Sequence, residues 1–104
     1  MDFEVGGAKM GQSVMTRTPV ELKLTIAAPS EIEKAEVVRL DVRSGVYNIA
    51  SHWNATGRVL EANFTDEPQG KLVMYYLRVQ LREPVRGRVV RGWSSPIWLV
   101  LEEK

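Results

Sequence analysis

The chain has 104 residues, of which 44% are hydrophobic and 26% are charged, so it is long enough for one domain with one core. Its 14 basic and 13 acidic residues leave a net charge of +1, which excludes a global attraction to nucleic acid or to an anionic membrane. It has no cysteine, which excludes disulfides, thiolate metal sites and a cysteine nucleophile. No apolar run approaches the roughly 20 residues of a membrane-spanning helix, and the acidic N-terminus does not match a signal peptide.

The first part of the chain predicts strands separated by turns. Residues 3–18 place glycines among isolated apolar residues, which favours a short strand and a loop over a helix. Residues 20–26 alternate between apolar and polar side chains, which predicts a half-buried strand. Residues 27–30 interrupt this run, and Ser30 begins a capping box typical of a helical turn. A further strand is predicted over residues 35–42, which are rich in β-branched side chains.

The middle of the chain predicts a hairpin. After a turn at Ser44-Gly45, residues 46–53 and 58–65 form two candidate strands. The polar segment 54–57 between them has the length of a hairpin loop. The next segment, 66–70, contains proline and glycine and predicts another turn.

The longest predicted strand covers residues 72–81. Its alternation places one set of side chains toward the core, namely Tyr75, Leu77, Val79 and Leu81. A turn over residues 83–87 leads to a return strand that begins near Arg88 and continues to Leu101.

The predicted fold is an all-β, immunoglobulin-like antiparallel β-sandwich of about seven strands, in a single domain over residues 1–104. In such domains a tyrosine near the start of one strand returns its hydroxyl to the backbone of the preceding corner, and Tyr75 occupies that place. The segment Ser94-Ser95-Pro96 should interrupt the last strand, because proline has no N–H to donate to a neighbouring strand.

Two motifs near the C-terminus resemble a known family. The strand Tyr75-Tyr76-Leu77-Arg78-Val79 and the ending Trp93-Ser94-Ser95-Pro96-Ile97-Trp98 are similar in order and spacing to the C-terminal β-sandwich domain of PHP-type metal-dependent phosphoesterases. The opening Gly11-Gln12-Ser13, the alternating strand at 20–26 and the segment 32–39 resemble the start of that domain. The basic tip between Arg82 and Arg91 departs from the short turn expected there.

The resemblance implies a non-catalytic accessory domain. In the family, a separate barrel domain rich in metal-binding His, Asp and Glu hydrolyses the phosphoester. We therefore expect residues 1–104 to be excised from, or related to, the C-terminal part of a larger protein. The expected partner is a PHP-type catalytic domain in cis or in trans, and we expect no cofactor, metal, nucleic acid or membrane to bind this chain.

His52 and Trp53 form the first candidate ligand site. His52 is the only histidine, so a multi-histidine metal site is excluded. The pair could bind a ligand such as a sugar, which exposed tryptophan rings stack against. The ordinary alternatives, which we favour, are a polar residue at a strand end and a tryptophan that packs in the core.

A basic cluster near the C-terminal hairpin forms the second candidate site. Six of the 14 basic residues lie within 21 positions, namely Lys71, Arg78, Arg82, Arg86, Arg88 and Arg91. Arginine matches the geometry of phosphate and carboxylate groups, so Arg82, Arg86, Arg88 and Arg91 are candidates for binding an anion. The favoured alternative is a solvated strand face whose arginines pair with nearby glutamates.

Two functional hypotheses follow. The first is a non-catalytic accessory domain that positions or packs on a phosphoesterase domain, which predicts an exposed apolar patch of several hundred Å². The second is a module that binds a carbohydrate or an anionic ligand. We do not expect an enzyme, because no pair of titratable side chains has catalytic spacing.

Overall fold

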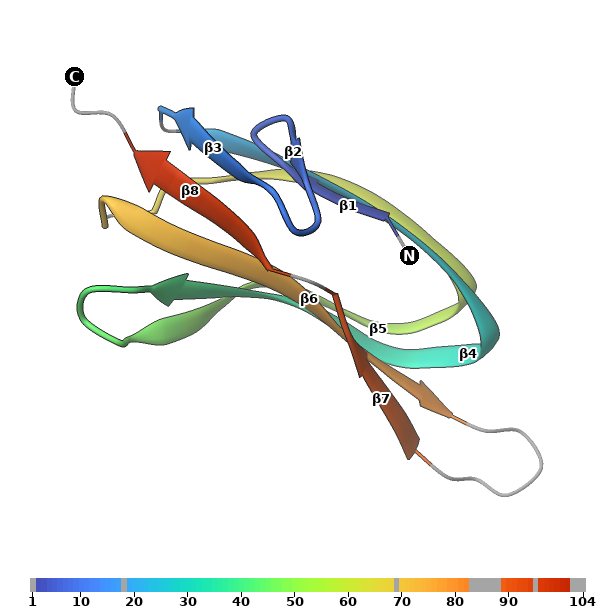
Figure 1. The fold of residues 1–104 in the computed structure, drawn as a ribbon. Helices are drawn as coiled ribbons and strands as arrows, with labels where there is room; N and C mark the ends of the chain where they lie inside the picture. The colour runs from blue at the N-terminus through green and yellow to red at the C-terminus, as the bar shows by residue number, and fades with distance from the viewer. Residues whose placement is uncertain (1, 18, 69, 83–88, 95, 102–104) are drawn as a thin grey trace.

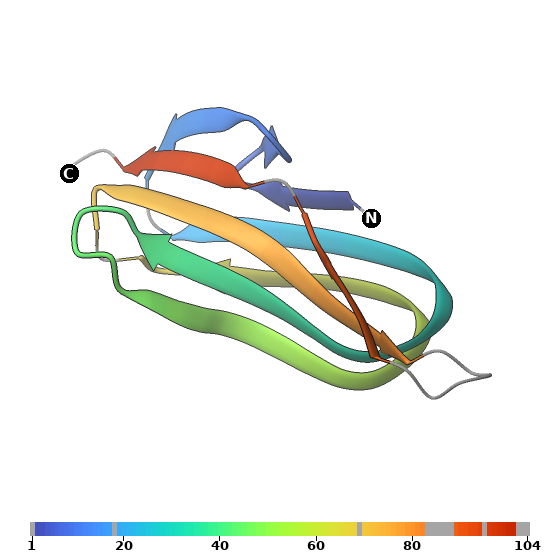
Figure 2. The same ribbon diagram turned by 60° about the horizontal axis from the view of Figure 1, so that its bottom comes forward.

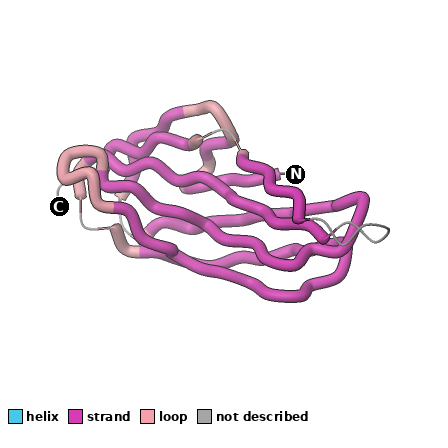
Figure 3. Tube along the Cα trace, turned by 90° about the horizontal axis from the view of Figure 1, so that it is seen from below, coloured by secondary structure: helices cyan, strands magenta, loops and turns pink. Residues whose placement is uncertain are grey.

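The computed structural model describes residues 2–17, 19–68, 70–82, 89–94 and 96–101, and within these ranges it leaves out the side chains of 55, 56, 89–91 and 93. The described residues form eight strands: β1 Asp2–Val5, β2 Ala8–Lys9, β3 Ser13–Thr16, β4 Val20–Asp41, β5 Tyr47–Asp66, β6 Leu72–Arg82, β7 Val89–Trp93 and β8 Ile97–Leu101 (Figure 1). The remaining described residues are turns and loops, so this part of the chain is all-β, as predicted (Figure 3).

The strands form one nearly closed, barrel-like sheet around the core. Along the sheet the order is β2, β1, β4, β6, β8 and β3, while β5 pairs with β4 and β7 pairs with β6. The pairing of β3 with β8 is parallel, whereas the other described pairs are antiparallel. The molecule is elongated, with extents of 51 × 24 × 20 Å.

The predicted break at residues 27–30 is wrong, because β4 passes through this segment as one strand of 22 residues. Its register with β5 is interrupted between Ala27 and Ile32, and here β4 bends. The sequence signal for a break came from Pro29, which cannot donate a backbone hydrogen bond. The backbone stays extended while the ladder is interrupted, so a bend within β4 replaces the predicted break.

The predicted hairpin between residues 46–53 and 58–65 is also wrong. Both segments belong to β5, and both pair with β4 along its length. The segment 54–57 lies where β5 follows the bend of β4, and Gly57 takes a φ of 77° there. That conformation favours glycine, so a loop-like composition marks a corner within one strand. Figure 2 shows β4 and β5 running together around this bend.

The core follows the predicted alternation. Val20, Leu22, Leu24 and Ile26 are all buried, which confirms the strand predicted for residues 20–26. In β6 the predicted core residues Tyr75, Leu77 and Val79 are buried, and Leu81 packs partly buried against the same cluster. From β8 the core receives Ile97, Leu99 and Leu101.

The predicted interruption of the last strand is confirmed. The first part of β6 pairs with β8 and the second part pairs with β7, so the partner changes near Leu77. At this change the Leu77 N–H donates to Ser94 Oγ at 2.8 Å, and the Ser94 N–H donates to the Leu77 carbonyl at 2.8 Å. The Ser94 hydroxyl thus accepts a hydrogen bond that a strand neighbour would otherwise accept, and Ser95 lies outside the described residues.

The turn before β3 links the N-terminal strands to the C-terminal strand. Gly11 has a φ of 82°, and its N–H donates to the Pro96 carbonyl at 2.9 Å. The Trp98 N–H donates to the Gln12 carbonyl at 3.1 Å. These bonds bring the motif segments at 11–13 and 96–98 together.

Candidate functional site

Asp66 is the centre of a polar cluster at one end of the barrel. The Tyr75 hydroxyl donates to Asp66 Oδ2 at 2.5 Å, and Arg39 Nη1 donates to the same oxygen. Arg39 and Tyr75 are register partners in β4 and β6, while Asp66 ends β5 opposite Val20. The cluster therefore ties the end of β5 to the distant part of β4. Tyr75 was expected to bond a backbone atom of the corner, and its described bond goes instead to a side chain.

The protonation states of Tyr75 and Arg39 allow both groups to donate hydrogen bonds to Asp66. Burial raises the pKa of the Tyr75 hydroxyl, and its hydrogen bond to Asp66 raises that pKa further. The hydrogen bond to Asp66 also raises the pKa of Arg39. Tyr75 thus stays neutral and donates a proton in a hydrogen bond, while Arg39 stays charged. Because Asp66 accepts from both groups, its Oδ2 is already occupied by donors of this chain.

His52 and Trp53 lie on opposite faces of β5. Trp53 packs against the core, and its ring contacts Phe64 with centroids 5.8 Å apart at an angle of 59°. His52 is exposed and lies opposite Glu36. The structure thus does not bring the two candidate ligand residues into one site, since adjacent strand residues point in opposite directions.

The described arginines of the basic cluster pair with glutamates of β4. Arg82 Nη2 lies 2.6 Å from Glu33 Oε1, and Arg78 Nη2 lies 2.9 Å from Glu36 Oε1. Hydrogen bonds from Gln80 and Arg82 lower the pKa of Glu33. For Arg91 the structure gives the backbone alone, opposite Gln80. Arg86 and Arg88 lie outside the described residues, so the anion-binding prediction is not addressed there.

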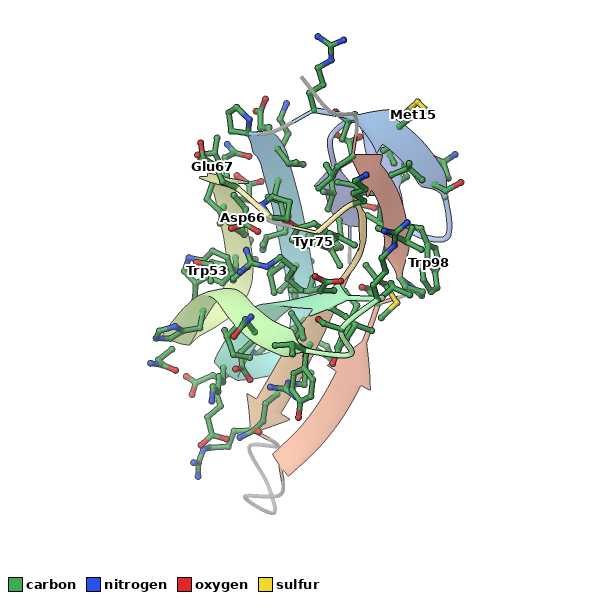
Figure 4. All side chains as sticks on the ribbon, turned by 90° about the vertical axis from the view of Figure 1, so that its left-hand side faces the viewer. Met15, Trp53, Asp66, Glu67, Tyr75 and Trp98 are labelled. Atoms are coloured by element: carbon green, nitrogen blue, oxygen red, sulfur yellow. The ribbon has the colours of Figure 1, made fainter. Side chains whose placement is uncertain are left out.

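The outer face of the sheet carries the most prominent exposed feature. Strand register aligns apolar side chains across this face in three rows: Tyr47, Leu40, Met74 and Trp98; Ile49, Val38 and Tyr76; and Leu72, Val100 and Met15. We call these residues the apolar outer face, in which Val38 is fully buried. The exposed fraction is 67% for Tyr47, 63% for Met15 and 38% for Trp98. Figure 4 shows Met15 and Trp98 on the side of the molecule opposite Trp53.

A β-bulge in β5 directs two of these side chains outward. Val37 lies opposite Ser51 and Val38 lies opposite Ile49, so Ala50 is an extra residue without a register partner. Alternation from the inward Trp53 would otherwise turn Ile49 and Tyr47 toward the core. The bulge reverses the inward–outward alternation of β5, so both side chains point outward and join the exposed surface.

The apolar outer face has a charged border. Further along β4 and β6, the same face carries Glu36, which is 8% exposed and contacts Arg78 at 2.9 Å. Lys34 Nζ lies 3.6 Å from the same carboxylate. Along β4 and β6, the outer face therefore changes from apolar side chains to ion-paired side chains.

The exposed part of the apolar outer face is formed by large side chains. Five of its residues are large, exposed hydrophobics, namely Met15, Tyr47, Ile49, Trp98 and Val100. Tyr47 and Trp98 bring roughly 150–250 Å² of surface each. Together with the three smaller side chains, their exposed parts reach on the order of a few hundred Å². Apolar patches of this extent on a monomer are often functional.

The apolar outer face was not among the predicted sites, although the sequence carries a signal for it. Residues 72–77 of β6 are apolar at both odd and even positions, and so are residues 97–101 of β8. A strand that is apolar on both sides is typically covered on both sides. The inward side chains of these strands were predicted to form the core. The outward apolar side chains indicate that something also covers the other side of the sheet.

Comparison with protein-family models, with curated proteins and with solved structures finds no significant match to this chain. Among the described residues, no three His, Asp or Glu side chains gather in a way that could hold a metal ion. The same part of the chain contains no helix that could span a bilayer.

Proposed function

We propose that this chain is a non-catalytic accessory β-domain that uses its apolar outer face to dock on a folded partner domain. The partner that the motif resemblance indicates is a PHP-type metal-dependent phosphoesterase domain, in cis or in trans. The observation that carries the proposal is the exposed apolar surface centred on Trp98 and Tyr47.

The composition of the face supports docking. Protein interfaces are enriched in Tyr, Trp, Phe, Met and Arg at their centres and have a polar rim that stays partly solvated. Here Tyr47, Met74 and Trp98 share one row, and the Glu36–Arg78 pair lies at the border. A folded partner with a complementary apolar patch would remove the exposed rings from water and leave the ion pair at the rim.

We also propose that the fold is related to immunoglobulin-like sandwiches. The two bent strands β4 and β5 each contribute to both sides of the barrel, which supports a flattened barrel related to immunoglobulin-like sandwiches. The bond from Tyr75 to the end of β5 supports the same relation, because it resembles the corner tyrosine of such domains.

The ligand-binding alternative has less support. Among the described residues, Arg82 is paired with Glu33, and Trp53 points away from His52 toward the core. No described arrangement favours a sugar platform or an anion site over docking.

The proposal is tested by measuring binding between this chain and a PHP-type catalytic domain by titration calorimetry. We expect Tyr47→Ser and Trp98→Ser each to weaken binding at least about tenfold, because buried aromatic anchors dominate interface energies. Val59→Ser is the matched control, because Val59 is 61% exposed but lies outside the apolar outer face. Binding that is equally sensitive to all three changes, or absent in the unmodified chain, would contradict the proposal.

A further inference from the structure

The second half of β5 is a long, regular edge of the sheet. Residues 59–66 pair with residues 20–27 of β4 without a register shift. Among the described residues no strand pairs with the opposite side of this segment, so its outward N–H and C=O groups lack a strand neighbour. The edge is eight residues long, which is longer than β1, β2 or β3.

This segment lacks most of the features that usually prevent edge pairing. Natural edges are protected by charged side chains, lysine above all, and by proline, bulges or a covering element. Residues 59–66 contain neither lysine nor proline, and their register is unbroken. Their two acidic residues are Glu61 and Asp66, and Asp66 is held by Arg39 and Tyr75 at the end of the segment. The first half of β5, in contrast, contains the bulge at Ala50 and the irregular corner near Gly57. The second half is therefore the part of β5 best suited to accept a strand.

The inward side of the segment is incompletely covered. Leu60 is buried, whereas Ala62 and Phe64 are only partly buried against the core. Phe64 has Trp53 on one side. An additional strand along the edge would cover the remaining apolar surface of Ala62 and Phe64.

We propose that the partner is a second copy of this chain, paired antiparallel through residues 59–65 and centred on Ala62. A two-fold dimer places the same patch on both sides of the interface. In this register Leu60 of one copy faces Phe64 of the other, and Glu61 faces Asn63. The charged Glu61 side chains thus avoid one another, and apolar residues meet apolar residues on the inward side.

The proposed dimer does not depend on the docking function, and it leaves the docking surface accessible. The apolar outer face involves residues 47–49 of β5, whereas the pairing edge begins at Val59, beyond the bend. Each dimer would therefore present two separate apolar outer faces. A failure of docking and a failure of dimerisation can be distinguished, because they depend on different residues.

Sedimentation of the chain over a range of concentrations tests the proposal. We expect a monomer–dimer equilibrium in the unmodified chain. Glu61→Lys combined with Asn63→Lys places lysines opposite lysines, and Asn63→Glu places glutamates opposite glutamates. Each variant should weaken self-association at least tenfold, and an equimolar mixture of the two should restore the dimer as a heterodimer.

Tyr47→Ser is the control, because it alters the docking surface and should leave dimerisation unchanged. Hydrogen exchange of the unmodified chain provides a second measurement that needs no variant. The amides of residues 59–66 should gain protection as the protein concentration rises. A monomer at every concentration, a dimer insensitive to both charge variants, or protection gained only on the apolar outer face would overturn the proposal.

Discussion

At the scale of single residues, Asp66 and its two donors are the clearest case of side chains that fix the fold. Asp66 accepts from Tyr75 and from Arg39, and its side chain is only 15% exposed. The carboxylate is far from Arg39 in sequence, so the pair holds two distant parts of the chain. Hydrogen bonds to charged groups contribute about 1.5–3 kcal/mol each when they are shielded from water.

Tyr75 gives a prediction for alkaline pH. Its pKa is raised in the folded chain, first by burial and then by Asp66, whereas an unfolded tyrosine ionises near about pH 10. The stabilisation that the neutral Tyr75 hydroxyl gives the folded chain is fully present below the pKa of the unfolded chain. It is lost as the pH rises toward the pKa of the folded chain. Urea denaturation between neutral and alkaline pH should show this loss.

Tyr75→Phe is the matched control for this titration. The variant should be less stable at neutral pH, but its stability should fall less steeply above about pH 10. Tyrosinate absorbance should assign the difference, because Tyr75 should ionise only as the chain unfolds. Identical pH profiles for the two proteins would contradict the assignment.

At the scale of elements, the exchange of partners along β6 depends on one hydroxyl. Ser94 Oγ accepts the Leu77 N–H at the point where β7 ends and before β8 begins. Without that acceptor, a core strand would have a backbone donor with no partner at the exchange. Ser94 of the Trp-Ser-Ser-Pro motif thus has a structural role that its hydroxyl explains.

Ser94→Ala should lower the free energy of unfolding by about 1–2 kcal/mol, because a part-buried N–H loses its acceptor. The measurement is urea denaturation followed by circular dichroism. Ser13→Ala, at an exposed strand position, is the control and should change stability by less than about 0.5 kcal/mol. Equal effects of the two substitutions would show that the hydroxyl does not complete the ladder.

Sequence patterns located the strands better than their connections. The alternation at residues 20–26 and in β6 predicted the core correctly, because burial on one side imposes a period of two. The pattern failed at 27–30 and 54–57, where proline and glycine mark bends within continuous strands. It also missed the apolar outer face. An unpaired Ala50 shifts the phase of β5, and a bulge depends on which strand lies opposite.

At the scale of the whole molecule, contacts across the two halves of β5 hold the barrel together along its unpaired edge. Trp53 lies in the first half and Phe64 in the second half, and their rings are in contact. The Arg39–Asp66 pair makes a second connection, from the second half of β4 to the end of β5. Both contacts hold the end of β5 against the opposite side of the barrel.

Trp53→Ala should destabilise the chain by about 2 kcal/mol or more, because it opens a gap beside the core and removes the contact with Phe64. Trp98→Ala is the comparison, since Trp98 is 38% exposed on the outer face and should cost less than Trp53→Ala. Chemical denaturation monitored by circular dichroism measures both. A larger loss for Trp98 would reverse our assignment of the two rings.

The long antiparallel pairing of β4 with β5 has a consequence for the kinetics of folding. The two strands meet at the short turn over residues 42–46, where Leu40 pairs with Tyr47, so their first contacts close a small loop. Pairing can then extend outward along both strands and resume beyond the bend, where the register is interrupted. The parallel contact between β3 and β8, in contrast, joins the two ends of the chain. We therefore expect the β4–β5 ribbon to nucleate folding and the junction of the chain ends to form last.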